Sequence, residues 1–474
     1  MCQHDLEESF ILVAFSNHGS LDAEPNLTSS AHSRHSCRST LKRNFTVAAA
    51  AVLSLSLIAL AGCSKSDSSS SDSTTTTVAI TTTVKVGALL DLTGDGKTLG
   101  LASQSVLEAG VESAAAQGVK VELDVRDTGG DPATALKELT SLNEAGVTSV
   151  IGPQTSSEAK NILPYADANG MILISQGSTA STLAVPTDSL FRMVPTDKVE
   201  GVASGDLITN KGPVTLITAN RDDAGNNGLV STVSADVAAG GGTVIKGPVY
   251  APEDTDFASV AQKIADAVAT ADSGATKAVY LAGYGEVAQI LAEASGIATL
   301  QNIPFYGGDG SAQSTDLTDD ATGAAFAAGS ADGYASPLPV IGDDAATPPE
   351  ELVKADPEPD PLAYGAYDAL MILTSVFAKD GADLKGADLR TAFMTAAEGY
   401  KGVTGVVTLD ASGDRATMPY AYWGICSADK AFEWKVLGGW VPPSPTEPAT
   451  TTKPGTITFT GCTPGADGGA AETP

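Results

Sequence analysis

The chain has 474 residues, with 57 acidic against 27 basic side chains, so its formal net charge at pH 7 is −30. This length allows two or three domains. The charge excludes a typical nucleic-acid-binding protein, because such proteins need a basic surface, and it indicates a soluble, self-repelling surface instead.

An apolar segment near the N-terminus has the features of an export signal. The basic pair Lys42-Arg43 precedes the apolar run 45–60, which is too short and wrongly flanked for a membrane-spanning helix. The run ends in Leu60-Ala61-Gly62-Cys63, which resembles the lipobox of bacterial lipoproteins. The resemblance implies that Cys63 is lipidated. We therefore expect an exported protein of the cell envelope, anchored by lipid to the outer face of the cytoplasmic membrane or in the periplasm.

This segment sets the first boundaries of the chain. We expect residues 1–62 to be a signal peptide with an upstream extension, because 1–40 is an unusually long stretch before a basic pair. A start site assigned too early would explain the extension, with Leu41 as a candidate for the true start. Residues 63–83 are rich in Ser and Thr and predict a flexible tether.

Processing at Cys63 would remove chemistry that depends on histidine. All four histidines precede that cysteine: His4, His18, His32 and His35. The processed chain could form no Ser-His-Asp triad, Cys-His pair or histidine metal site, so we expect no enzyme and no cofactor. Cys426 and Cys462 remain, and in an exported protein they predict a disulfide that holds the C-terminal tail to the folded part.

Strands and helices alternate from residue 84 onward. Short apolar runs predict strands at 84–90, 119–125, 147–151, 171–175 and 191–195. The stretches between them predict helices, one of which starts with Asp131 as N-cap and Pro132 as first helical residue. Such βα units fold as a doubly wound parallel sheet.

A second βα series follows the first and predicts a second lobe. Its strands are expected at 214–219, 243–250, 277–282 and 303–306. An extended segment at 324–334 and a surface loop at 337–361 are expected to follow. The last predicted elements are helices at 362–378 and 389–397 and β segments at 403–409, 420–425 and 432–437. We expect lobe 1 at 84–195 plus about 335–400, lobe 2 at 196–334 plus about 401–440, and a tail at 441–474.

Two hydroxyl-rich loops follow neighbouring strands in lobe 1. They are Thr155-Ser156-Ser157 and Gly177-Ser178-Thr179. Because one crossover helix separates the two strands, both loops should lie at the same edge of the sheet. That edge is where open α/β sheets bind small molecules.

These features together resemble the leucine/isoleucine/valine-binding proteins of ABC importers. The resemblance rests on the order and spacing of 84-VKVG-87, Thr93-Gly94, Asp127 before the Asp131-Pro132 start, 150-VIG-152, 174-ISQGST-179, Phe191-Arg192 and 306-YGGDG-310. It covers residues 84–437, although no single motif is specific. It implies the type I periplasmic-binding-protein fold, in which two α/β lobes joined by three crossings enclose the ligand by hinge closure.

The resemblance also assigns roles to site residues. Ser156 and Thr179, with backbone N–H groups near Ser178, resemble the groups that hold an α-carboxylate. Tyr284 and Asp309 resemble the pair that meets an α-ammonium group, for which a buried carboxylate is suitable. A ligand that lacks either charge would leave polar groups unpaired, at a cost of roughly 1–3 kcal/mol per group.

Two positions depart from the amino-acid binders. Ala224 stands where many of them have a tyrosine that covers the ligand, and Leu99 stands where an aromatic residue is common. Both changes reshape the pocket, and other branches of the family take amides, urea or aromatic acids. The ligand therefore stays open among these classes.

Each residue also has an ordinary structural interpretation. Ser156 and Ser157 could cap a helix, Thr179 could be a turn hydroxyl, and Asp309 between glycines could belong to a tight turn. Tyr284 could be a core or rim residue. The acids Asp91, Asp95, Asp127 and Asp131 fit loops and helix caps better than a catalytic pair.

The residues and the resemblance together favour one function. We expect a monomeric, lipid-anchored solute-binding protein that captures a small polar solute, with an amino acid of the branched-chain type first, and delivers it to an ABC permease. A ligand-sensing receptor module of the same fold is the alternative. An enzyme is the third class, and the lost histidines argue against it.

Overall fold

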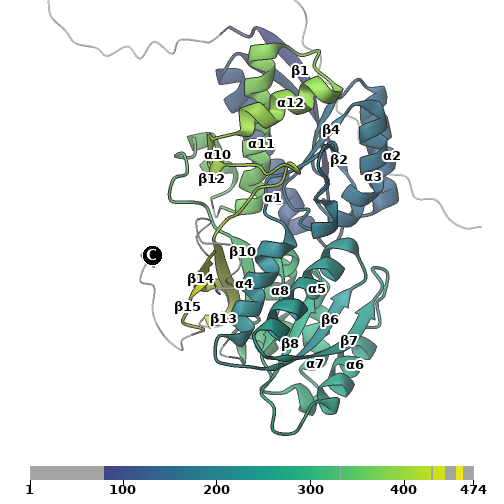
Figure 1. Cartoon of the computed structure of the whole chain (residues 1–474), viewed down its shortest axis with the longest axis vertical. Coiled ribbons are helices and arrows are strands. Elements are labelled where there is room, and N and C mark those ends of the chain that lie inside the picture. The colour runs from purple at the N-terminus through teal and green to yellow at the C-terminus, as the bar shows by residue number, and fades with distance from the viewer. Residues whose placement is uncertain (1–78, 331, 358, 429–430, 443–454, 463–474) are drawn as a thin grey trace, which may run out of the picture. The chain divides into compact units, whose positions relative to one another are not determined.

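The computed structural model describes residues 79–330, 332–357, 359–428, 431–442 and 455–462. The expected signal peptide, Cys63 and most of the tether lie outside these described residues. The described part contains two α/β lobes, each built on a parallel sheet, and a separate antiparallel sheet (Figure 1). The chain passes between the lobes three times: after β5 (Leu190–Arg192), after β10 (Ser336–Pro339) and before β13 (Tyr420–Ala428).

Lobe 1 is built on a five-stranded sheet with the order β2-β1-β3-β4-β5. Its other strands are β1 (Thr82–Leu90), β2 (Val119–Asp127), β3 (Ser149–Ile151) and β4 (Ile172–Ser175). The helices are α1 (Lys97–Ala116), α2 (Pro132–Glu144), α3 (Ser156–Asn169), α10 (Glu350–Ala355), α11 (Pro361–Asp380) and α12 (Gly386–Ala397). One hydrophobic cluster joins the sheet to α1, α11 and α12, and another joins it to α2 and α3. The sheet is therefore covered on both faces, which explains its continuous apolar strands.

Lobe 2 is built on a four-stranded sheet with the order β7-β6-β8-β9. The strands are β6 (Thr215–Arg221), β7 (Thr243–Tyr250), β8 (Lys277–Ala282) and β9 (Phe305–Tyr306). The helices are α4 (Asp197–Thr209), α5 (Ala224–Ala239), α6 (Phe257–Thr270), α7 (Val287–Ala294), α8 (Thr315–Asp319) and α9 (Ala321–Ala328). Three short 3-10 turns complete the two lobes: η1 (Ser181–Leu183), η2 (Ala298–Leu300) and η3 (Asp309–Ser311).

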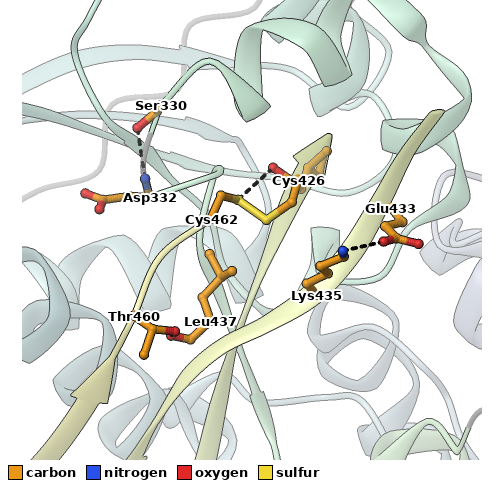
Figure 2. Close-up of a disulfide and its surroundings, with 9 residues drawn as sticks. Ser330, Asp332, Cys426, Glu433, Lys435, Leu437, Thr460 and Cys462 are labelled. Atoms are coloured by element: carbon orange, nitrogen blue, oxygen red, sulfur yellow. Dashed lines mark hydrogen bonds and ion pairs between the residues drawn. A yellow bond between two sulfur atoms is a disulfide. The ribbon is translucent and has the colours of Figure 1, made fainter. Parts of the chain in front are cut away.

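The third sheet gathers late segments of the chain in the order β10-β13-β14-β15, with β14 at Ala431–Val441 and β15 at Thr456–Phe459. Its Tyr420, Tyr422 and Trp440 pack with the α4 and α5 side of lobe 2. Cys462, just after β15, is joined to Cys426 in β13 by a disulfide (Figure 2). Residues 456–459 of the expected tail 441–474 form the strand β15, which pairs with the edge of β14.

Three expectations from the sequence differ from the structure. The segment 324–334 was expected to be extended, but α9 occupies 321–328, because the Asp320 carboxylate accepts hydrogen bonds from the N–H groups of Thr322 and Gly323 and caps a run of helix-forming alanines. The expected loop 337–361 begins with β10 and contains α10.

The third difference concerns the second boundary of lobe 2. The hairpin β11 (Tyr400–Gly402) and β12 (Gly405–Val407) was expected in lobe 2, but Val403, Val407 and Leu409 pack in the lobe 1 core. The carboxylate of Asp368 in α11 holds this hairpin, because it accepts hydrogen bonds from the N–H groups of Val403 and Thr404 at 2.8 and 3.0 Å.

One helix of the described part, α11, is long and apolar enough to cross a membrane. Of its most apolar window, 83% is buried inside the protein. It packs against α1 and α12 in the lobe 1 core, so we assign it as a core helix.

Candidate functional site

A cavity lies where loops of the two lobes meet. Five of the residues expected to bind a ligand line it: Leu99, Ser156, Thr179, Tyr284 and Asp309. Its volume is about 50 Å³, which is room for several water molecules, so only a small solute could fit without a movement of the lobes. The structure therefore brings residues of both lobes to one site, as the resemblance implies.

The two hydroxyl-rich loops of lobe 1 are bonded to each other. Ser156 is the first residue of α3, and its Oγ accepts hydrogen bonds from the N–H groups of Thr179 at 3.2 Å and Ala180 at 3.0 Å. The hydroxyl of Ser178 also donates to Ser156 Oγ, at 3.3 Å. The oxygen of Ser156 is thus fully used as an acceptor, and its own O–H proton is the group it can offer to a ligand.

The N-cap of α3 is Thr155 and not Ser156. Thr155 Oγ1 accepts from the N–H of Glu158 at 3.3 Å, and the Glu158 carboxylate accepts from the N–H of Thr155 at 2.8 Å. This reciprocal pair is a capping box. The simple capping interpretation of Ser156 is therefore wrong, and Thr155 and Ser156 at the start of α3 line the cavity.

The backbone N–H of Ser178 was expected to take part in the anion site. It instead donates to Ser175 Oγ at 2.9 Å, and Ser178 is buried and absent from the cavity lining. Ser178 therefore supports Ser156 from behind. In lobe 1 the groups left for an anionic end are the hydroxyl of Ser156 and the start of α3, together with the hydroxyl of Thr179, which also lies next to the buried carboxylate of Asp197.

Lobe 2 contributes Asp309 and Tyr284, each just after a strand of its sheet. Asp309 begins η3 after β9, and its backbone N–H donates to the Glu200 carboxylate at 2.9 Å. Burial raises the pKa of Asp309, and repulsion from Asp197 raises it further. Tyr284 follows β8, and its N–H donates to Glu286 at 3.0 Å. Burial also raises the pKa of the Tyr284 hydroxyl, so this side chain is a neutral hydrogen-bonding group.

Ala224 and Leu99 differ in their relation to the cavity. Leu99 lines it, as expected for the side-chain end of a ligand. Ala224 does not, because it is the first residue of α5 and its methyl group is short. Its N–H donates instead to Ser157 Oγ at 3.0 Å, a hydrogen bond between the two lobes.

Arg221 is a site residue that the sequence did not single out. It ends β6, and its Nη1 lies 2.5 Å from Asp95 of lobe 1 and 3.6 Å from Glu286. The guanidinium also lies over the Tyr284 ring, 5.4 Å from its centroid. A basic residue at the carboxyl end of a strand was the available signal, but a partner 126 residues away could not be read from spacing.

The charge of the cavity lining is one-sided. Asp95, Asp309 and Asp360 line it, and no lysine or arginine does so among the described residues. Asp360 also caps α11, because it accepts from the N–H of Leu362 at 2.8 Å. Asp95 is paired with Arg221, but no ion pair of the described residues includes Asp309 or Asp360, and such carboxylates favour a cationic group on a ligand. No group of acidic, histidine or cysteine side chains in the described residues could hold a metal ion.

Contacts across the mouth of the cavity hold the lobes together. The ion pair of Arg221 with Asp95 is one such contact. A second ion pair joins Lys97 of α1 to Asp316 of α8, with 2.5 Å between Lys97 Nζ and Asp316 Oδ2. The N–H of Gly285 donates to the carbonyl oxygen of Asp95 at 3.2 Å. The ion pairs of this set can form and break with lobe movement, because their side chains are partly exposed.

Comparison with known proteins gives a consistent result. A family model described as "Periplasmic binding protein" matches residues 83–425. The uncharacterized protein MJ1266 of Methanocaldococcus jannaschii is 29% identical over 381 residues, which cover 75% of this chain and 89% of that protein.

Solved structures show the same fold. The substrate-binding protein LivJ of a branched-chain amino acid transporter of Streptococcus pneumoniae, in complex with isoleucine, has a TM-score of 0.61 and 21% identity, covering 75% of this chain and 99% of that one. A solute-binding protein of an ABC transporter of R. palustris, in complex with benzoate, has a TM-score of 0.60 and 21% identity, covering 74% and 94%.

Proposed function

Because the chain belongs to the periplasmic binding protein family, we propose that it captures a small polar solute outside the cytoplasm, an amino acid of the branched-chain type, and delivers it to an ABC permease. Proteins of this family are solute-binding components of ABC transporters and act outside the cytoplasm. The amino acid, the lipid anchor at Cys63 and the monomeric state are our proposals.

The polarity of the cavity is the observation that carries this proposal. Lobe 1 offers hydroxyl donors, Ser156 and Thr179, and lobe 2 offers the acidic Asp309. A zwitterion matches both sides, because its carboxylate meets hydroxyl and helix-start donors and its ammonium group meets a carboxylate. Leu99 and Leu229 in the same lining suit an apolar side chain, which supports a branched-chain amino acid.

Capture would work by lobe closure. Either lobe alone presents half of the polar groups, so a ligand gains both sets of contacts only in the closed form. The ion pairs of Asp95 with Arg221 and of Lys97 with Asp316 would stabilise the closed form. The permease would then recognise the closed arrangement.

An aromatic acid is the second candidate, because the benzoate complex has the same fold. A benzoate bound here would place no cation beside Asp309. Benzoate would leave the acidic side chain of Asp309 without a cationic partner, whereas an amino acid would pair its ammonium group with it. This electrostatic argument favours the amino acid.

A matched ligand screen tests the proposal. Melting temperature and calorimetric titration would be measured with L-leucine, L-isoleucine, L-valine, benzoate, acetamide and 4-methylpentanoate, which is leucine without its ammonium group. We expect the amino acids to bind and to raise the melting temperature by mass action. Binding of benzoate with no binding of any amino acid would reject the amino-acid proposal.

A further inference from the structure

Behind Asp309 lies a second acidic side chain that the proposed function does not use. Glu200 is in the first turn of α4 and has no solvent exposure. Its Oε1 accepts the backbone N–H of Asp309 at 2.9 Å. Its Oε2 has no N–H or O–H donor within hydrogen-bond distance among the described residues. The Glu200 side chain is therefore held directly against the residue proposed to meet an ammonium group.

No ion pair in the described part of the chain includes Glu200 or Asp309. The ion pairs of Arg192 and Arg221 are made with Asp414, Asp95, Asp223 and Glu286, and none includes Glu200 or Asp309. The titratable groups that act on the pair from the packed elements are Asp197 of α4, Asp223 before α5, Tyr280 of β8, Tyr284 after β8 and Tyr420 of β13. Tyr420 is buried, and its hydroxyl has no hydrogen-bond partner in the described part.

Two adjacent carboxylates in such surroundings cannot both be ionised at little cost. Removal from water disfavours the charged form, and each negative charge disfavours the other. Burial raises the pKa of Glu200 well above its usual range, and repulsion from Asp309 raises it further. A single proton held between the two groups removes one charge and supplies the hydrogen bond that Glu200 Oε2 lacks.

We propose that Glu200 and Asp309 share one proton in the ligand-free protein, and that an ammonium group entering the cavity displaces this proton to solvent. This inference rests on the proposed function, since it needs a ligand with a cationic end. One proton leaves as one ammonium group enters, so the net charge of the site does not change. Glu200 is then a positioning residue that keeps the charge of the pair, counted together with any bound cation, at −1 both before and after a cation arrives.

Proton release on binding is the direct test. Leucine would be titrated calorimetrically into wild type and Glu200→Gln near neutral pH, in phosphate and in Tris, whose ionisation enthalpies differ. The glutamine oxygen can still accept the Asp309 N–H, but the side chain cannot titrate. We expect about one proton released per leucine by the wild type and nearly none by Glu200→Gln. Equal release by both proteins would overturn the proposal.

A second measurement needs no ligand. Infrared spectra of the ligand-free protein at neutral pH should show a protonated carboxyl band that Glu200→Gln lacks. The control Glu144→Gln, at an exposed position at the end of α2, should retain this band. No difference between wild type and Glu200→Gln would reject the shared proton, even if leucine binds. If the band is present but no amino acid binds, the proposed function is rejected, while the shared proton between Glu200 and Asp309 is supported. Circular dichroism would verify that each variant is folded.

Discussion

Arg192 and Asp414 form a buried pair at the crossings between the lobes. The guanidinium donates two hydrogen bonds of 2.6 Å to the carboxylate, and the side chains are 0% and 2% exposed. Arg192 Nη1 also donates to the carbonyl oxygen of Ala180 at 2.8 Å. The pair thus connects two crossings to the loop that carries Thr179.

Removal of one partner of this pair should destabilise the protein strongly. Arg192→Met leaves the Asp414 carboxylate buried without a counter-charge, so we expect the free energy of unfolding to fall by about 3–5 kcal/mol. Urea unfolding followed by circular dichroism would measure it. The double variant Arg192→Met/Asp414→Leu should recover part of the loss, and a double variant less stable than the single one would contradict this account.

Two adjacent serines should behave differently. Ser156→Ala leaves the N–H groups of Thr179 and Ala180 without an acceptor inside lobe 1, so we expect a loss of about 1–3 kcal/mol in unfolding free energy for each group and weaker leucine binding. Ser157→Ala removes only a hydrogen bond between the lobes, to Ala224, and should weaken leucine binding without that loss of stability. Calorimetry and urea unfolding on both variants would separate the two roles.

Asp309→Asn should discriminate between ligands. It removes the negative charge that meets an ammonium group, so we expect leucine affinity to fall by roughly 2–3 kcal/mol, or about 30- to 150-fold. Binding of 4-methylpentanoate, which has no ammonium group, should not weaken. Equal losses for both ligands, measured by calorimetric titration, would dismiss the role of Asp309.

The buried Asp197 should make stability depend on pH. The pKa of Asp197 is raised from 3.8 to about 6, and burial is the largest cause of this shift. As the pH rises from 3.8 to about 6, the unfolded chain loses this proton before the folded protein does, so stability is lost across that window. Above it the penalty stays constant at roughly 3 kcal/mol.

Asp197→Asn removes this titration. We expect the variant to equal the wild type near pH 4 and to be more stable by up to roughly 3 kcal/mol at pH 7. Urea midpoints across the pH range would measure the difference. Asp272→Asn, at an exposed position, is the control and should follow the wild-type curve. If Asp197→Asn also follows the wild-type curve, Asp197 is not held protonated in the folded protein.

The disulfide between Cys426 and Cys462 should stabilise the third sheet. It closes a segment with a sequence separation of 36, so we expect its reduction to cost about 3–4 kcal/mol in unfolding free energy. Mass spectrometry without reductant should show both cysteines lacking their thiol hydrogens. Free thiols at both positions in the secreted protein would refute the disulfide.

Much of the fold could be predicted because buried parallel strands leave a clear signal. The runs at Val86 to Leu90 and Ile172 to Ser175 are apolar on both faces, and Asp131-Pro132 marks a helix start by local chemistry alone. The helix α9 was missed, because its alanines and glycine give no helical periodicity in apolar character.

The candidate site was less predictable, because its partners are far apart in the sequence. Glu200 lies 109 residues before Asp309, and Asp95 lies 126 residues before Arg221. The residues that follow strands could be placed at a sheet edge. The sequence could not show that the N–H groups of Thr179 and Ala180 are bonded to Ser156, because this depends on how Ser156 packs against the next loop.

The residues of the cavity have one feature in common, which affects how specificity can change. Ser156, Thr179, Tyr284 and Asp309 each follow a strand and do not belong to it, so the two sheet cores are built from other side chains. Substitutions at Tyr284 could therefore alter the preferred solute while the cores keep their packing. Such a division makes the scaffold readily adaptable in evolution and suitable for the engineering of biosensors.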